Sequence, residues 1–243
     1  MWKLFFEICD FLCNFIPSRR IRNKIRTEQL FDWRRKYNAL RKKYPGLNFH
    51  RTKMIKGGWN IGFIVDKKYV FKIRKRFDKS TPTEKIMREK QITDAFRDIS
   101  PLRIPKIDIV DADGYIFYKY DFIPGRNLNT YSARTIKSHA PQWGAQIAEF
   151  IYAVHNARPG ALDNMRGPRD GDGWNHNDIC NNLIVDNKTM RIVGLIDWEY
   201  AGWGLLTTEF NNTVRFSKKI RESGIQGIII AQYNAMATTK TAK

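Results

Sequence analysis

Residues 174–203 read WNHNDICNNLIVDNKTMRIVGLIDWEYAGW, and this stretch decides the fold. Its apolar runs at 182–185 and 192–196 predict two short strands joined by a turn. Asp178 lies in the loop before the first strand, and Asp197 directly follows the second. We therefore expect the hairpin to hold these two carboxylates on either side of one cleft.

Two carboxylates in this order suit the transfer of a phosphoryl group. One of them orients or deprotonates the attacking hydroxyl, and the other holds the magnesium ion that is bound to ATP. A side-chain oxygen completes the metal shell, and either Asn181 or Asn182 is available for it. Taken singly, each aspartate would be explained as a helix cap or a turn residue.

A second predicted hairpin supplies groups that suit the phosphates of a nucleotide. It opens with residues 56–62, KGGWNIG, whose paired glycines let the backbone approach a phosphate closely, although no Walker A sequence follows. Lys72 stands between apolar neighbours on the hairpin's second strand, so its amine can reach into a cleft. This cation needs a carboxylate to hold it, which Glu89 on the next predicted helix can provide, with Glu84 as the alternative.

The pattern of apolar residues and breakers predicts a small mixed lobe followed by a helical lobe. Prolines and glycines punctuate the pattern, as in the Pro-Gly pair at 124–125. We expect helices at 27–43, 83–96 and 143–155, and strands at 59–65, 68–75 and 115–123.

These features follow one another along the chain in a recognisable order. The glycine-rich hairpin with its strand lysine comes first, then a helix glutamate and a hinge strand that ends in Ile-Pro-Gly, and finally His-Asn-Asp and Ile-Asp-Trp-Glu-Tyr-Ala-Gly. In this order they resemble the choline/ethanolamine kinases and their wider relatives, the aminoglycoside phosphotransferases. The resemblance covers residues 55–210. It implies a two-lobed, protein-kinase-like α+β fold with a small β-rich N-lobe and a mainly helical C-lobe.

The resemblance also implies an activity, its cofactors and its site. The enzyme would transfer a phosphoryl group from ATP, bound with Mg²⁺, to an alcohol group. Asp178 would be the catalytic base, assisted by Asn182, and Asp197 and Asn182 would bind Mg²⁺. Glu199 and Trp203 would face the acceptor. The residues implied for nucleotide binding are Gly57, Gly58, Asn60, Lys72, Glu89, Tyr120, Asp121 and Ile123.

Three departures from the family pattern fall within or after the catalytic stretch. Leu183 stands where the family carries its metal-binding asparagine, and Asn182 comes one residue early. Glu209 replaces the aspartate that follows the Ala-Gly segment. Only 46 residues follow Asp197, so we expect a reduced acceptor pocket. These departures motivate an alternative function, a nucleotide-binding pseudokinase or interaction protein.

The N-terminus combines an apolar stretch with a basic cluster. Polar residues between Lys3 and Asn14 recur at spacings of four, three and four, on one narrow stripe of a predicted helix that Pro17 ends. From residue 1 to 56 there are 15 Lys and Arg against 4 Asp and Glu. Because apolar insertion and attraction to anionic lipid add together, we expect residues 1–26 to contact an anionic membrane surface. The alternative is a helix packed on the kinase-like core.

Composition limits the partners and the location of the protein. The 243 residues carry a net charge of +19, which favours anionic partners. No nucleic-acid-binding motif accompanies this charge, so nucleic acid is an unfavoured partner. No apolar run is long enough to cross a bilayer, and the positive charge follows the apolar stretch rather than preceding it as in a secretory signal. We expect a cytoplasmic protein with free thiols, held peripherally at the inner face of the membrane.

The expected organisation has three parts. They are an amphipathic and basic helical segment at 1–50, the N-lobe at 51–123, and the C-lobe with the catalytic loop at 124–243. The acceptor would be a small molecule or a glycan. The choline-kinase-like residues favour an amino alcohol, whereas the N-terminus favours an acceptor made at a membrane, as in lipopolysaccharide or surface-glycan biosynthesis.

Overall fold

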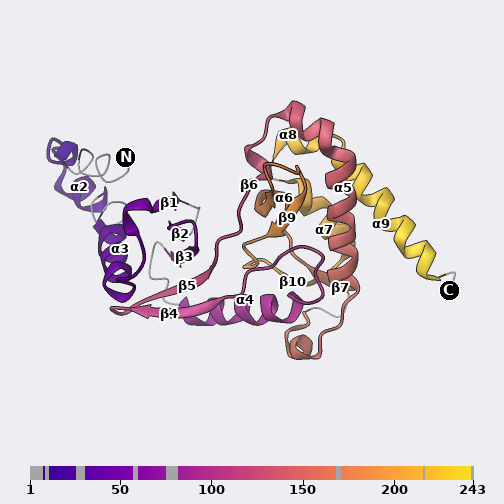
Figure 1. Cartoon of the computed structure of the whole chain (residues 1–243), viewed down its shortest axis with the longest axis horizontal. Helices are drawn as coiled ribbons and strands as arrows, with labels where there is room; N and C mark the ends of the chain where they lie inside the picture. Colours follow the sequence, from indigo (N-terminus) through magenta and orange to yellow (C-terminus); the bar gives the residue numbers. More distant parts are fainter. Residues whose placement is uncertain are drawn as a thin grey trace. The chain divides into compact units, whose positions relative to one another are not determined.

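A computed structural model describes residues 8, 11–25, 31–56, 60–74, 82–167, 171–215 and 217–241 (Figure 1). It separates into two compact units, each with its own hydrophobic core. Unit 1 comprises Met1–Ile86 and Ile107–Phe122, and unit 2 comprises Met87–Lys106 and Ile123–Lys243. The predicted α+β class is confirmed, because unit 1 is built on a sheet and unit 2 mainly on helices. The predicted domain boundaries at residues 50 and 123 stay a prediction.

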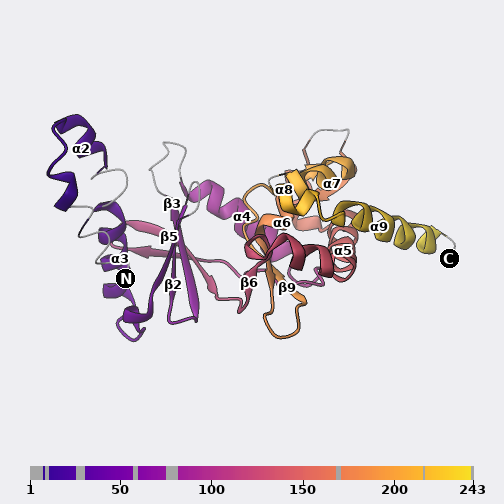
Figure 2. The ribbon, with the colours of Figure 1, turned by 90° about the horizontal axis from the view of Figure 1, so that it is seen from above.

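Unit 1 contains a five-stranded antiparallel sheet in the order β1-β2-β3-β5-β4. Figure 2 shows strands β2, β3 and β5 side by side. Leu40 of helix α3 belongs to the same core cluster as Phe63 and Phe71 of the sheet, and all three side chains are fully buried. The elements of unit 1 are α2 (Arg19–Ile25), α3 (Phe31–Lys43), η2 (Phe49–Arg51), β1 (Lys53–Lys56), β2 (Asn60–Val65), β3 (Tyr69–Arg74), β4 (Asp108–Ala112) and β5 (Tyr115–Asp121).

The predicted hairpin of unit 1 is present as β2 and β3. Asp66 and Lys67 form its turn with φ values of 55° and 52°. Positive φ at both central residues is the conformation whose twist matches that of two antiparallel strands. The hairpin places Lys72 opposite Gly62 in the register of the sheet.

Unit 2 is organised around the long helix α5, which packs against α9 (Figure 1). Gly144 permits this approach, since a Cβ atom there would lie 2.7 Å from the side chain of Ile228. Trp143, Trp174 and Trp198 are buried in the same core. The elements of unit 2 are β6 (Arg126–Asn127), η3 (Leu128–Thr130), α5 (Ala133–Asn156), η4 (Gly160–Met165), β7 (Gly173–Asn175), α6 (Ile179–Asn182), β8 (Leu183–Val185), β9 (Ile192–Leu195), β10 (Gly202–Gly204), α7 (Leu206–Arg215), α8 (Lys218–Arg221) and α9 (Ile225–Thr241).

Helix α4 (Pro82–Phe96) crosses the division between the two units, which falls after Ile86. Its bounds agree with the predicted helix at 83–96. Helix α3 likewise matches the predicted helix at 27–43 over the described residues. None of the helices in the described ranges is both long and apolar enough to cross a membrane.

Two elements of unit 2 begin at other residues than predicted, and the strand predicted at 192–196 ends at Leu195. Helix α5 begins ten residues before the predicted position at 143, because Ser132 caps it through a hydrogen bond from the Thr135 N–H and the helix tolerates Pro141. The strand predicted at 182–185 begins only at Leu183, because Asn182 completes the single helical turn of α6.

Candidate active site

The catalytic loop predicted at His176–Asp178 connects strand β7 to the helical turn α6 in unit 2. Asn177 has a φ of 67°, a left-handed conformation that few residues other than glycine adopt. Its N–H donates to a carboxylate oxygen of Glu209 at 2.9 Å, and its side-chain amide donates to the carbonyl of Tyr200 at 3.0 Å. Contacts with Glu209 of α7 and with the carbonyl of Tyr200 therefore hold this left-handed turn.

His176 connects the catalytic loop to the residue before Asp197. The Asp178 N–H donates to Nδ1 of His176 at 3.2 Å, so Nδ1 carries no proton. The proton then lies on Nε2, which donates to the carbonyl of Ile196 at 3.2 Å. A neutral imidazole of this tautomer fixes the loop and the end of strand β9 relative to each other.

Asp178 is half-buried and accepts hydrogen bonds from two neighbouring amides. Asn181 donates to Oδ1 at 2.6 Å, and Asn182 donates to Oδ2 at 3.1 Å. Burial raises the pKa of Asp178 and the two amides oppose that rise, while the carboxylates of Asp197 and Glu199 raise the pKa further. A carboxylate that is oriented and made more basic in this way suits the role of a general base.

The two asparagines differ in what their oxygens do. The Oδ1 of Asn181 accepts a hydrogen bond from the side chain of Asn129, and its carbonyl accepts one from Asn127 at 2.5 Å. Asn182 instead accepts the N–H of Ile196 on its carbonyl at 3.2 Å, directly beside Asp197. Because the Asn181 oxygen already has a donor, the geometry favours Asn182 of the two as a metal ligand.

Asp197 follows strand β9 with a φ of 64°, a second left-handed residue in the site. The next residue, Trp198, is fully buried and donates its backbone N–H to Oε1 of Glu89 at 3.1 Å. Glu89 thus connects α4 to the chain beside Asp197. Glu89 was predicted to hold Lys72, which lies in the other unit, and that pairing stays a prediction.

The donor set around Asp197 fits a magnesium ion that is shared with a nucleotide. The described residues contain no group of three or more His, Cys, Asp or Glu side chains that could hold a metal. Mg²⁺ at a kinase site needs no such cage, because phosphate oxygens and water fill most of its shell and one or two protein oxygens suffice. The carboxylate of Asp197 and the amide oxygen of Asn182 are ligands of the right kind.

The residues predicted to bind the nucleotide come mostly from unit 1. Lys72 is buried on β3, with its amine 5.1 Å from the centre of the Tyr118 ring. Asn60 is buried at the start of β2. Tyr120 and Asp121 end strand β5, opposite Val70 and Tyr69 of β3.

Ile123, Gly57 and Gly58 were also predicted to bind the nucleotide. Ile123 begins the second segment of unit 2 and is buried against Gly194, where a Cβ atom would meet it at 2.8 Å. Gly57 and Gly58 lie outside the described residues, as do Lys3, Glu7 and Asp10 of the predicted N-terminal stripe. The nucleotide-binding roles of Ile123, Gly57 and Gly58, like those of the residues of unit 1, stay predictions.

Trp203, which was predicted to face the acceptor, lies on β10 opposite Trp174 of β7. Two guanidinium groups lie over its ring, that of Arg158 at 4.9 Å and that of Arg166 at 5.2 Å from the ring centre. An ion pair of 2.6 Å with Asp163 holds Arg166. The surroundings of this indole are therefore cationic. Its partner in the sheet, Trp174, lies two residues before His176, at which the catalytic loop begins.

Two polar contacts beneath the loop were not predicted from the sequence. Glu209 is almost completely buried, and burial raises its pKa to about 7, although the backbone N–H groups of Asn177 and His176 oppose that rise. His155 is buried at the end of α5 and contacts Asn175 at 3.1 Å and Asp172 at 3.0 Å. The departure at Glu209 was visible in the sequence, whereas nothing near His155 indicated its partners.

The fold has the protein-kinase-like architecture of solved phosphotransferases. Among solved structures, the chain is similar to the ADP-bound aminoglycoside phosphotransferase APH(2'')-Ib, with a TM-score of 0.65 and 15% identity over 82% of this chain and 81% of that one. It is also similar to macrolide 2'-phosphotransferase type I, with a TM-score of 0.58 and 14% identity over 84% and 82% of the two chains. Identities this low show the fold alone.

The family comparison adds a match to the part of the chain that contains the catalytic stretch. Residues 162–240 match the model of the phosphotransferase enzyme family. No curated protein matches the chain. The expected resemblance to these phosphotransferases and the kinase-like fold are confirmed.

Proposed function

We propose that the protein is a kinase that transfers the terminal phosphoryl group of ATP to a hydroxyl of a small molecule or glycan. The observation that carries this proposal is Asp178, whose carboxylate is oriented by two amides and made more basic by burial. In the proposed reaction, Asp178 accepts the proton of the acceptor hydroxyl while the hydroxyl oxygen attacks the terminal phosphorus of ATP; the bond from that phosphorus to the bridging oxygen breaks, and ADP leaves with its electron pair. The left-handed turn at Asn177 and the His176 contact hold Asp178 in place for that step.

Magnesium is the proposed metal, held by Asp197 and Asn182. When bound with the nucleotide, it would neutralise charge on the phosphates. Solved structures of similar fold are complexes with ADP or GDP, so a purine nucleotide is the proposed phosphate donor. We propose ATP rather than GTP, and a turnover assay with each nucleotide distinguishes them.

Of the two acceptor classes that the sequence suggests, we favour a glycan or another uncharged or anionic molecule. Choline and related amino alcohols carry a positive charge, and aromatic faces recognise such cations when no competing cation covers them. Arg158 and Arg166 already lie over Trp203, the aromatic residue of β10 that was predicted to face the acceptor. We also propose that the protein works at the inner face of the membrane, where a lipid-linked or surface glycan would be assembled.

The test of this function is ATP turnover against choline, ethanolamine, free sugars and lipid-linked glycans. Asp178→Asn should lower the turnover of any accepted substrate by roughly a hundredfold or more. Asp98→Asn is the matched control, since Asp98 is exposed and follows the last turn of α4. Equal rates for Asp178→Asn and the unchanged protein would remove the catalytic assignment.

A second candidate function is a nucleotide-binding pseudokinase, and one observation favours it. Leu183 occupies the position at which the family carries its metal-binding asparagine, and it is fully buried in the core of unit 2. If Asn182 does not bind the metal, nucleotide would bind without magnesium. Thermal shift with ATP, with and without magnesium, separates the two functions, because stabilisation that ignores magnesium would support the pseudokinase.

A further inference from the structure

The described part of the N-terminus exposes an unusual concentration of large apolar side chains. In the described residues, the exposed large apolar side chains number eleven, and five of them lie between residues 8 and 21. Such a concentration is typical of a surface that binds a partner or a membrane. The five are Ile8 (47% exposed), Phe11 (62%), Leu12 (55%), Phe15 (70%) and Ile21 (53%).

This exposed stretch is attached to unit 1 by its own buried residues. Cys13 is 5% exposed and belongs to the core cluster of unit 1, and Ile16 packs against the same cluster. The rings of Phe11 and Phe15 contact each other edge to face, with centres 5.4 Å apart. Because Cys13 and Ile16 face the core, the large apolar residues beside them are presented to solvent.

Positive charge lies immediately beyond these apolar side chains. Residues 11–25 contain four Lys and Arg and no Asp or Glu. Arg19 and Arg20, at the start of α2, are exposed, and no ion pair is found for either of them within the described ranges. Apolar side chains that insert into the acyl boundary, beside arginines that meet anionic headgroups, are the two components of peripheral membrane attachment.

We propose that Ile8, Phe11, Leu12, Phe15, Arg19, Arg20 and Ile21 form a docking surface for a bilayer that contains anionic phospholipid. Charge complementarity selects an anionic partner, and the aliphatic members select lipid over nucleic acid. Nucleic acid is bound by basic grooves and by aromatic faces that stack on bases, and exposed Ile and Leu side chains contribute to neither. This surface assigns specific residues to the proposed membrane location. Its test does not depend on phosphoryl transfer, so it can fail or succeed independently of the proposed kinase activity.

The test is co-sedimentation of the full chain with vesicles of phosphatidylcholine alone and of phosphatidylcholine mixed with phosphatidylglycerol. We expect binding only to the mixed vesicles, weakened by added salt. Arg19→Gln with Arg20→Gln should weaken binding by roughly twenty- to thirtyfold. Phe11→Ser with Phe15→Ser should weaken it by about tenfold or more, since the change removes the two largest apolar side chains of the surface, and binding strength scales with the buried apolar area.

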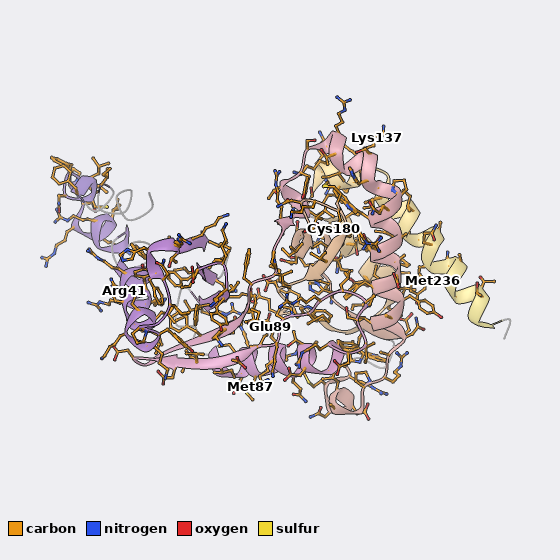
Figure 3. The ribbon with its side chains drawn as sticks, in the orientation of Figure 1. Arg41, Met87, Glu89, Lys137, Cys180 and Met236 are labelled. Atoms are coloured by element: carbon orange, nitrogen blue, oxygen red, sulfur yellow. The ribbon has the colours of Figure 1, made fainter. Side chains whose placement is uncertain are left out.

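The matched control removes the same charge elsewhere in the chain. Arg134→Gln with Lys137→Gln changes two exposed residues of α5 in unit 2, and Lys137 extends away from that helix (Figure 3). We expect this control to bind mixed vesicles within about twofold of the unchanged protein, because the docking surface retains its charges. Unfolding curves that superimpose would establish that each variant folds.

Four results would overturn the docking surface. These are absence of vesicle binding, equal binding to both kinds of vesicle, equal weakening by the control variant, or full binding after the phenylalanine substitutions. A salt-sensitive affinity for duplex DNA without vesicle binding would replace lipid by nucleic acid as the partner.

Discussion

Replacing Glu209 by Gln should change how the stability of unit 2 depends on pH. Glu209 is 1% exposed, and its carboxylate accepts the backbone N–H of Asn177 at 2.9 Å beneath the catalytic loop. Burial raises its pKa from 4.5 to about 7. Glutamine keeps the shape and the accepting oxygen but does not titrate, so the substitution isolates the effect of ionisation.

The sign and size of the effect follow from the pKa of Glu209 in the two states. The folded protein binds this proton more tightly than the unfolded chain, so the contribution to stability is full below pH 4.5 and is lost as the pH rises through about 7. A shift of this size corresponds to about 3 kcal/mol at 1.36 kcal/mol per pKa unit. Relative to Glu209→Gln, the unchanged protein should therefore lose about 3 kcal/mol of unfolding free energy between pH 4.5 and pH 8.

Urea unfolding followed by tryptophan fluorescence measures this difference, because Trp143, Trp174 and Trp198 are buried in unit 2. The quantity to plot is the unfolding free energy of Glu209→Gln minus that of the unchanged protein at each pH. The matched control is Glu222→Gln, whose side chain is 64% exposed and should give a flat line. A flat line for Glu209→Gln, or one that falls with rising pH, would refute the reasoning.

Three further results are expected. Gly125→Ala should lower the unfolding free energy measured in urea by about 2–3 kcal/mol, because Gly125 has a φ of 145°. In the control Gly227→Ala, the new Cβ atom in α9 meets no atom within 4 Å, so the unfolding free energy should rise by up to about 1 kcal/mol. As the pH falls, kcat/KM should decline when Asp178 becomes protonated, and burial places this decline above the ordinary aspartate pKa of 3.8. Asn181→Ala removes an amide that lowers the pKa of Asp178, so this acid limb of the kcat/KM profile should move to higher pH. Asn182→Ala should raise the magnesium concentration required for half-maximal turnover by tenfold or more, and an unchanged requirement would exclude Asn182 as a ligand.

The sequence predicted those parts of the fold in which local signals agree. The turn at Asp66 and Lys67 joins two β-branched and aromatic runs, and the hairpin forms there as expected. Helix α4 likewise begins within one residue of its predicted start and ends at the predicted residue, Phe96. In each of these elements, tertiary packing reinforces the local preference rather than overriding it.

Other parts of the structure depend on contacts that local patterns do not contain. The first turns of α5 are polar and contain Pro141, so the periodicity predicted a later start, and packing against α9 stabilises the full length. The contacts of His155 with Asn175 and Asp172 join residues far apart in the sequence. Such side-chain contacts follow from the completed fold and cannot be read from spacing.

The one-residue displacement of Asn182 has a structural explanation in α6. The residues from Ile179 to Asn182 form a single helical turn, so the side chains of Asn181 and Asn182 approach the Asp178 carboxylate from positions three and four residues later. Both oxygens of Asp178 therefore receive an amide, while Leu183 turns into the core as the first residue of β8. The same turn leaves the Asn182 carbonyl bonded to Ile196, beside Asp197. Asn182 thus comes one residue earlier than the asparagine of the family, yet it contacts Asp178 and lies beside the chain at Asp197. This position favours the kinase over the pseudokinase.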